Sequence, residues 1–550
     1  MIFRSAWRSC ALILVSCTGV ISGPSTSVSD SSALCSTAAK PVSAGTKLVR
    51  LTHMQYDNTV RDLLGVSTAP SAGFARDPTF QGFNNNAAGL KVADRLGRDY
   101  RRAAEDLSVQ AASAVALSKV SPCSAATDAC AKQFIETFGK RAFRRPLTDA
   151  EKAAYFALFK AANTLIDGTD SHLKGVQLTI EAMLQSPNFL YRVELAEQAP
   201  ADGRVPLNSY ELASRLSYLL WSSMPDNTLL GLADSGSLSD TAQLKAQTVR
   251  MLADPRARAV VDDFHSQWLD LDRDNNLNRD PVLYPAFSAA MAPAMQQETL
   301  RFLKNIVFDE TAPFSTIYTA PYTFVNKDLA ALYKLPGTFS STEFTKVTLD
   351  PAQRRGLLTQ IGFLASHSYT RTDSPIHRGV FLIRRVLGLP QGDPPPGIDF
   401  TLPPVGAGAI RTTRDQVTAK TSPAGCAGCH TTINAFGFAF ENYDAVGQYR
   451  TQENNVDVDS NGSVALGETS VRFKNALELS TAISTAPDAR LSYAANWLRY
   501  GYQRAETSDD LCELTTMARN LGIDGYFIKD MIGALTSTTS FRYGPVETTP

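Results

Sequence analysis

The chain has 550 residues, of which 44% are hydrophobic and 29 are proline, so it is long enough for several folded domains and too apolar to be disordered. Its formal net charge of −1 excludes the strongly basic composition that is typical of nucleic-acid-binding proteins. We therefore expect three to five globular domains and no nucleic acid as a partner.

The N-terminal segment predicts export. Two arginines precede an apolar run, Ala11 to Val15, that is far shorter than the roughly 20 residues needed to span a bilayer. The run ends in Leu14-Val15-Ser16-Cys17, which resembles the lipobox of bacterial lipoproteins, whose cysteine is lipidated and becomes the mature N-terminus. We expect a lipoprotein signal peptide over residues 1–16 with Cys17 lipidated; a plain signal peptide cleaved near Ser22 is the alternative.

Helix-start signals recur along the first half of the chain. Each is a capping residue followed three positions later by Glu or Gln, as in Thr52–Gln55, Thr148–Glu151 and Asn208–Glu211. Apolar side chains follow at helical spacing, and Gly65 stands where a glycine ends the first of these helices. Further helices are expected over 90–118, 240–253, 256–270 and 287–308, which makes this half helical throughout.

Four cysteines remain besides Cys10 in the signal peptide, the lipidated Cys17 and the two in the motif described below, and they are expected to form disulfides. Cys123 and Cys130 lie seven residues apart in a loop-like stretch, and an exported chain meets an oxidising compartment. Cys35 and Cys512 then remain as a second pair, while free thiols are the alternative for all four.

The arginines within residues 141–145 are expected on a solvated or ion-paired face.

The stretch 423–430 contains Cys426, Cys429 and His430 in the order Cys-x-x-Cys-His, which is the attachment motif of c-type haem. Thiols three positions apart lie on one face of a helical turn, and the histidine that follows projects toward the iron. We expect one covalent haem c held by Cys426 and Cys429, with His430 as the proximal ligand. A redox dithiol or half of a zinc site is the alternative, but the flanking sequence supplies neither a βαβ unit nor two more zinc ligands.

The second axial ligand decides between two kinds of haem protein. A histidine or methionine there makes an electron carrier, whereas an open position binds peroxide or oxygen. His367 ends a helical run in the same segment and is the first candidate for the distal ligand. The other candidates are His377, Met517 and Met531. Arg371 or Arg378 is expected to pair with a haem propionate, with a surface role as the alternative.

A calcium-loop pattern follows over residues 457–468. It matches the EF-hand at five positions, Asp457, Asp459, Asn461, Gly462 and Glu468. Position nine is an alanine, and Gly467 disfavours the helix that should leave the loop. We expect a polar β-turn here rather than a calcium site, followed by three or four helices over 471–543.

The order of these motifs resembles a family of large exported bacterial proteins built from five consecutive domains of unknown function. The resemblance rests on the segments Leu51–Gly65, Arg141–Leu147, Ala213–Trp221, Ser374–Gly379, Cys426–His430 and Gly437–Asp444. It covers nearly all of the mature chain. It implies a cytochrome-c-like haem segment inside a helical assembly and no known reaction.

We therefore expect a mainly α, multi-domain helical assembly that contains a cytochrome-c-like haem segment. After the signal peptide, the expected divisions are a flexible tether over 17–45, helical domains over 46–118, 123–195 and 200–335, the haem domain over 352–452 and a C-terminal helical domain over 468–545. The expected function is electron transfer by an exported c-type haem protein in the periplasm or on the outer membrane. The alternatives are a haem-dependent oxidase or peroxidase and an envelope scaffold with a vestigial haem. The expected partners are a redox protein or small oxidant, and the membrane through a lipid anchor.

Overall fold

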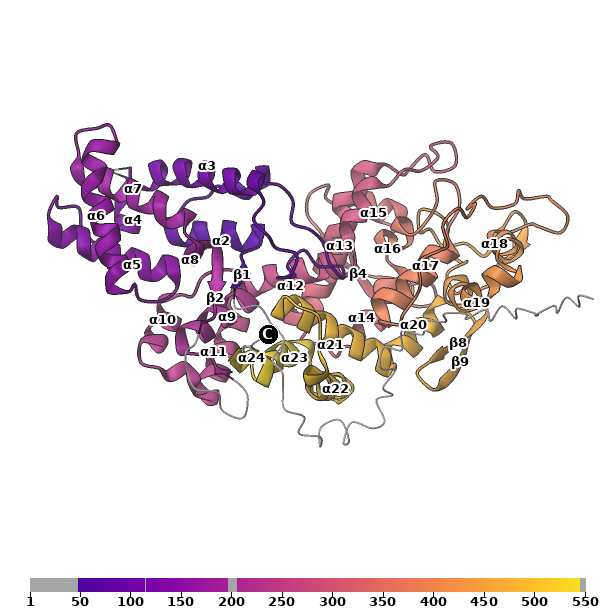
Figure 1. Ribbon diagram of the computed structural model, residues 1–550. Helices are drawn as coiled ribbons and strands as arrows, with labels where there is room; N and C mark the ends of the chain where they lie inside the picture. The colour runs from indigo at the N-terminus through magenta and orange to yellow at the C-terminus, as the bar shows by residue number, and fades with distance from the viewer. Residues whose placement is uncertain (1–47, 114, 196–204, 545–550) are drawn as a thin grey trace, which may run out of the picture.

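The computed structural model describes residues 48–113, 115–195 and 205–544, which fold mainly into α-helices (Figure 1). The strands within these ranges form two-stranded antiparallel sheets. The fold is therefore mainly α and multi-domain. No helix of the described ranges is both long enough and apolar enough to cross a bilayer.

The N-terminal part comprises eight elements around one core. They are β1 (Leu48–Arg50), α2 (His53–Leu64), α3 (Asp94–Ala111), α4 (Leu117–Val120), α5 (Asp128–Phe143), α6 (Asp149–Leu165), α7 (Ser171–Gln185) and α8 (Pro187–Leu190). A short strand, β2 (Tyr191–Val193), pairs with β1 and so joins the two ends of this part. The capping boxes at Thr52 and Thr148 are present as predicted. The helix predicted over 90–118 is shorter, because α3 ends at Ala111 and the chain turns before α4.

The disulfide predicted between Cys123 and Cys130 is present, with a Cα–Cα distance of 5.9 Å. The expectation of a solvated arginine face is wrong for Arg144, which is buried. Its guanidinium donates to the carbonyl oxygens of Phe189 and Tyr191 at 3.0 and 2.7 Å. Arg144 therefore ties the end of α5 to α8 and to the start of β2.

The middle part begins with β3 (Val205–Pro206) and α9 (Ser209–Trp221), whose predicted capping box at Asn208 is present. It continues through α10 (Asn227–Asp234), α11 (Thr241–Ala253), α12 (Pro255–Trp268), α13 (Ala292–Lys304), α14 (Thr316–Thr319), β4 (Tyr322–Val325), α15 (Lys327–Leu332) and β5 (Thr345–Thr348). Helices α11 to α13 agree with the predicted ranges to within a few residues, because each has a clear apolar period.

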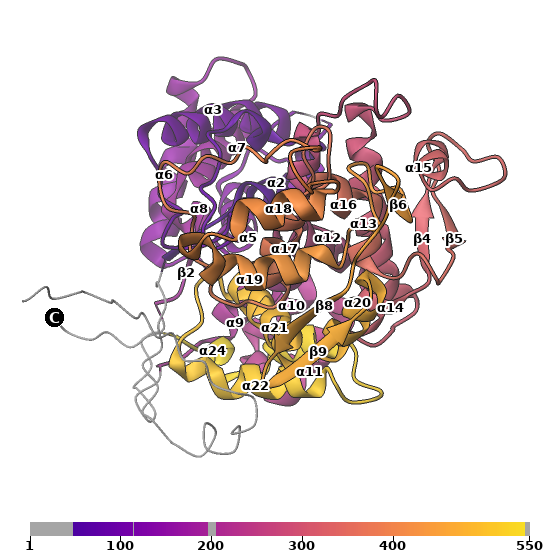
Figure 2. The ribbon, with the colours of Figure 1, turned by 90° about the vertical axis from the view of Figure 1, so that its right-hand side faces the viewer.

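The next part carries the Cys-x-x-Cys-His motif. Its helices are α16 (Ile361–Ser366), α17 (Pro375–Phe381), α18 (Thr413–Thr421) and α19 (Ala424–Phe438), with a π-helical turn over Leu382–Val386 after α17. Two small hairpins follow, formed by β6 (Gln452–Glu453) with β7 (Val456–Asp457) and by β8 (Gly462–Leu466) with β9 (Thr469–Phe473). Helices α17, α18 and α19 lie side by side (Figure 2).

The C-terminal part has five helices rather than three or four. They are α20 (Ala476–Thr485), α21 (Pro487–Tyr502), α22 (Leu511–Asn520), α23 (Ile528–Leu535) and α24 (Thr539–Arg542). The shortest of these spans too few residues for a periodic pattern to reveal it. Strand β10 (Tyr543–Gly544) then pairs with β3, so the described C-terminus returns to the middle part.

These parts share cores instead of having one each. One cluster of buried apolar side chains holds β1 to β2 together, and a second, larger cluster runs from α9 through α17 and α19 to α24. A third, small cluster joins α13, α15 and α16. In Figure 1 the first cluster's helices lie at the indigo end and α18 and α19 at the opposite end, with α12 and α21 between them.

Candidate functional site

The first two turns of α19 carry Cys426, Cys429 and His430. Pro423 precedes the helix with its φ fixed at −55°, and the two cysteines then fall one turn apart on one face. Both are free thiols, Cys426 partly exposed and Cys429 exposed. Gly425 has no atom within 4 Å of where a Cβ would lie, and the same is true of Gly428. Both cysteines are therefore accessible to solvent, and the neighbouring glycines add no side chains that would cover them.

A hydrogen-bond chain orients His430. Its Nδ1 lies 3.3 Å from Oδ1 of Asn434, one helical turn further on. Nδ2 of Asn434 donates to Oγ1 of Thr421 at 2.8 Å, and this hydroxyl donates to the carbonyl of Val417 at 2.7 Å. Since the hydroxyl of Thr421 donates its one proton to Val417, its oxygen must accept the bond from the side-chain amide of Asn434. The NH₂ group of Asn434 therefore faces Thr421, and Oδ1 faces the imidazole of His430. His430 thus carries its proton on Nδ1 and keeps the Nε2 lone pair for a metal.

Two cavities lie along α18, and His430 lines one of them. The first, of about 340 Å³, is lined by His430, Asn434, Arg414 and residues 461–463. The second, of about 560 Å³, shares Arg414 with the first and reaches the turns of β6 and β7. Arg414 donates to the carbonyl oxygens of Asp459 and Asn461 at 2.9 and 3.0 Å, which holds its guanidinium at the boundary between the two cavities.

Close packing against α17 anchors α19. A Cβ on Gly379 would lie 2.1 Å from the carbonyl oxygen of Ile433, and one on Gly437 would lie 1.9 Å from that of Pro375. Only glycine permits backbones to approach this closely. Because Pro375 meets Gly437 while Gly379 meets Ile433, the two helices run antiparallel, and His377 lies on the face of α17 turned away from α19.

The arginines expected to meet a propionate are placed differently. Arg378 is fully buried and donates to the carbonyl oxygens of Phe440 and Tyr443, both at 3.0 Å. Arg378 packs under the turn that follows α19. It therefore reaches neither the surface nor a group bound at the surface, and both expectations for it are wrong. Arg371 is exposed and forms an ion pair with Asp280 at 2.7 Å.

His367 is buried between the rings of Phe363 and Phe381, at centroid distances of 5.0 and 4.7 Å. Its Nδ1 lies 2.9 Å from the carbonyl oxygen of Phe363, so Nδ1 carries the proton and Nε2 the lone pair. Burial, helped by the positive charge of Arg273, lowers the pKa of His367 to about 3, so the ring is neutral at neutral pH. Of the other candidates, His377 packs on Tyr369, and Met517 and Met531 are buried in the large core.

The alternative of a zinc site at the motif requires further protein ligands beside Cys426 and Cys429. No set of three His, Cys, Asp or Glu side chains in these ranges is grouped to hold a metal ion, so a zinc site at Cys426 and Cys429 lacks its other protein ligands there. The donor set of two free thiols and one imidazole with a free Nε2 fits covalently attached haem. Asn434 and Arg414 were missed from the sequence: Asn434 is four residues from His430 on one helical face, whereas only the tertiary structure brings Arg414 there.

Residues 457–468 form the end of β7, a connecting turn and β8. Asp457 accepts a hydrogen bond from Gln452 at 2.9 Å, and Asp459 lies 3.4 Å from Arg414. Gly467 takes a φ of +60° in the turn between β8 and β9. The residues after Glu468 therefore continue as a strand where an EF-hand has a helix.

Several predictions lie outside the described ranges. These are the signal peptide, the lipidation of Cys17, the tether, and the Cys35 half of the expected Cys35–Cys512 pair. Cys512 itself is disulfide-bonded.

Comparison with protein families yields five matches that follow one another along the chain. Each family is described as a protein of unknown function: DUF1587 matches residues 50–113, DUF1595 residues 130–194, DUF1592 residues 207–335, DUF1588 residues 354–453 and DUF1585 residues 470–541. The Cys-x-x-Cys-His motif falls within the DUF1588 match. No curated protein and no solved structure matches the chain.

Proposed function

This chain consists of five consecutive domains of unknown function, and we propose that the fourth carries one covalent haem c and that the protein transfers electrons through it. Thioether bonds form at Cys426 and Cys429, and His430 is the proximal ligand. The observation that carries the proposal is the first part of α19, where two free thiols stand beside an imidazole whose Nδ1 faces the acceptor Oδ1 of Asn434.

The protein contributes attachment and orientation. Haem c, when bound, supplies a one-electron redox centre. Asn434 holds the tautomer and plane of His430, and the glycine contacts with α17 keep α19 rigid beneath it. Arg414, at the boundary of the cavities beside His430, is the cation best placed among the lining residues to pair with a propionate. A redox protein or small oxidant is the partner, and the lipid on Cys17 holds the exported protein at the membrane.

A haem-dependent oxidase or peroxidase is the second candidate. The cavity of about 340 Å³ that His430 lines favours it, because its described lining contains no methionine and no other histidine. Space for a small oxidant next to the iron is what such an enzyme needs and an electron carrier lacks. The choice depends on the distal ligand, for which His367 stays the first candidate.

Attachment is tested by producing the full chain in a host that matures c-type cytochromes. Wild type should keep its Soret and α bands after denaturation and acid extraction, because thioether bonds survive both. The double variant Cys426→Ala/Cys429→Ala should lose the bands, and Thr431→Ala, one residue beyond His430, is the matched control. Wild type without covalent haem would disprove the proposal.

The ferric spectrum separates the two candidates. A low-spin spectrum that becomes high-spin in His367→Ala indicates a six-coordinate electron carrier. A high-spin wild-type spectrum together with peroxide-dependent turnover of a dye indicates the enzyme. A spectrum that does not change in His367→Ala excludes His367 as a ligand. An envelope scaffold is indicated if His430→Ala abolishes the haem bands but leaves the cellular function of the protein intact.

A further inference from the structure

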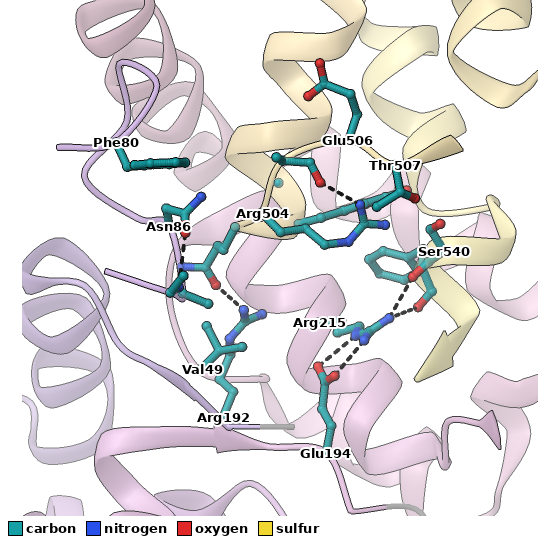
Figure 3. A pocket seen from close by; sticks show the side chains of 17 residues that line it. Val49, Phe80, Asn86, Arg192, Glu194, Arg215, Arg504, Glu506, Thr507 and Ser540 are labelled. Carbon is teal, nitrogen blue, oxygen red and sulfur yellow. Dashed lines mark hydrogen bonds and ion pairs between the residues drawn. The ribbon is translucent and has the colours of Figure 1, made fainter. Parts of the chain in front are cut away.

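A third cavity, of about 420 Å³, lies apart from the Cys-x-x-Cys-His motif, where four of the five matched domains meet (Figure 3). Its walls come from the segment before α3, from β2, from α9 and from the chain after α21. In Figure 3 the side chains of Arg192, Arg215 and Arg504 converge on it from three different elements. Three positive charges in one cavity repel each other unless each is neutralised by a negative charge.

Two of these arginines are neutralised by the protein itself. Both nitrogens of one edge of Arg215 donate to Glu194, at 2.7 and 2.6 Å. Arg504 donates to both carboxylate oxygens of Asp510, at 2.7 and 2.9 Å. Such bidentate pairs match one positive charge with one negative charge.

Arg192 is different. It is 6% exposed, forms no ion pair with a carboxylate among the described residues, and its Nε has no hydrogen-bond partner. The groups in contact with its guanidinium are neutral: Oε1 of Gln503, to which Nη2 donates, and the ring of Tyr218, 5.6 Å away. Burial lowers the pKa of Arg192 to about 10, which leaves it charged at neutral pH. The nearby charge of Glu194 raises the pKa of Arg192, but this carboxylate forms its ion pair with Arg215. A buried, unmatched charge is costly unless an anion compensates it.

Gln503 adds a second unused donor at the same place. It is 1% exposed, its Nε2 has no partner, and its backbone takes the left-handed conformation at φ +55°. This conformation ends α21 and turns the Gln503 side chain toward Arg192. Nε of Arg192 and Nε2 of Gln503 are thus two N–H donors at one wall of the cavity that no acceptor of the protein satisfies.

We propose that this cavity binds a small monocarboxylate, whose anionic group is received by Arg192 and Gln503. One negative charge is required, because Arg192 is the one lining arginine without a carboxylate partner and a dianionic phosphate would carry excess charge next to Glu194. An apolar body suits the remaining walls, where Phe80 is 54% exposed and Phe541 is buried. This site is independent of the haem proposed above.

The experiment uses the full chain, with benzoate and hexanoate as probes and benzamide as the neutral isostere of benzoate. Isothermal titration should give binding of at least one carboxylate at millimolar concentration or below, and none of benzamide. Arg192→Met should weaken that binding by at least about tenfold, the effect expected for loss of hydrogen bonds to a charged group.

A second variant keeps the test valid if Arg192→Met does not fold. Gln503→Glu places a carboxylate against Arg192 without changing the size of the side chain, so it should raise Tm and weaken carboxylate binding at least about tenfold. Gln133→Glu makes the same charge change at an exposed position of α5 and should leave binding as in wild type. The proposal is overturned if neither carboxylate binds, if benzamide binds as well as benzoate, or if Gln503→Glu binds as wild type does.

Discussion

His430 owes its orientation to a chain of hydrogen bonds that ends on the backbone of α18. Asn434 is the central member, because it accepts from the imidazole and donates to Thr421. An acceptor on Nδ1 makes a ligating histidine more basic and so stabilises the oxidised metal. A single amide thus controls both where the imidazole points and how strongly it donates.

Replacement of Asn434 by Ala should therefore raise the reduction potential of the haem-loaded protein, measured by spectroelectrochemistry. The free energy of unfolding should fall by about 1–2 kcal/mol, because two hydrogen bonds of a buried side chain are lost. Thr431→Ala removes a hydroxyl that bonds to Ala427 and not to His430, so it should leave the potential unchanged. An unchanged potential in Asn434→Ala would show that His430 does not use this acceptor.

Two buried carboxyl groups set the response of stability to pH. Burial raises the pKa of Asp274 to about 8 and that of Glu298 to about 7. A negative charge on Glu298 also adds to the cost of ionising Asp274. In the unfolded chain both groups release their protons near pH 4. Between pH 4 and 8 the folded protein thus binds protons that the unfolded chain does not, and stability from these groups is lost as the pH rises.

Asp274→Asn should remove its share of this loss. Relative to wild type, the variant should gain up to about 1.4 kcal/mol in unfolding free energy per pH unit as the pH rises from 5 toward 8. Buried histidines such as His265 titrate equally in both proteins and cancel in the difference. Urea unfolding at several pH values measures it, with Asp272→Asn, at an exposed position, as control. A constant difference between variant and wild type would contradict a raised pKa.

At the scale of elements, helices α17 and α19 contact each other directly through their backbone atoms. Gly379 and Gly437 let each helix touch a carbonyl oxygen of the other, and side chains such as Ile433 fill the space around the crossing. Since cores are close-packed, a methyl group added here cannot be absorbed without moving a helix. The rigidity of α19, the helix that we propose attaches haem, depends on this contact.

Gly437→Ala is expected to lower the free energy of unfolding by about 1–3 kcal/mol or more, because its Cβ would lie 1.9 Å from the carbonyl oxygen of Pro375. Gly425→Ala is the matched control on the same helix, where the new methyl group meets open space. There helix propensity alone applies, and the expected change is a gain of up to about 1 kcal/mol. Equal effects of the two substitutions in guanidinium unfolding would contradict the close contact.

At the scale of the whole molecule, the five matched domains share cores and are tied by long-range contacts. Strand β10 pairs with β3, and Arg215 on α9 contacts both Glu194 and the carbonyl oxygens of Ser540 and Phe541. One side chain thus joins the second, third and fifth matched domains. We expect these domains to unfold together rather than in separate steps.

Arg215→Met should cost about 3–5 kcal/mol, because it leaves Glu194 buried without its partner. Arg101→Met breaks an exposed ion pair with Glu105 on α3 and should cost less than about 1 kcal/mol. Calorimetry measures both, and limited proteolysis should show the segment after α23 cleaved earlier in Arg215→Met. If Arg215→Met loses no more stability than Arg101→Met, the ion pair does not tie the domains together.

What the amino-acid sequence determined by itself was local. The capping boxes at Thr52, Thr148 and Asn208, the disulfide between Cys123 and Cys130, and the five consecutive domains were all predicted from it and are present. The capping boxes and the disulfide depend on spacings within a short stretch of chain, where backbone geometry leaves few alternatives, whereas the five domains were implied by a resemblance of short motifs in order along the chain. The placement of two thiols and an imidazole on one helical face follows from the same 3.6-residue period.

Only the tertiary structure decided which distant residues meet. It buried Arg144, which was expected on a solvated or ion-paired face, and Arg378, which was expected at a propionate or on the surface. It also brought Thr421 to Asn434 and left Arg192 without a carboxylate partner in a cavity between domains. Burial and pairing arise from contacts between segments that are far apart in the chain, and one helical pattern is compatible with many such arrangements. The chemistry of the motif is therefore encoded in a few residues, whereas its surroundings depend on the packing of nearly the whole molecule.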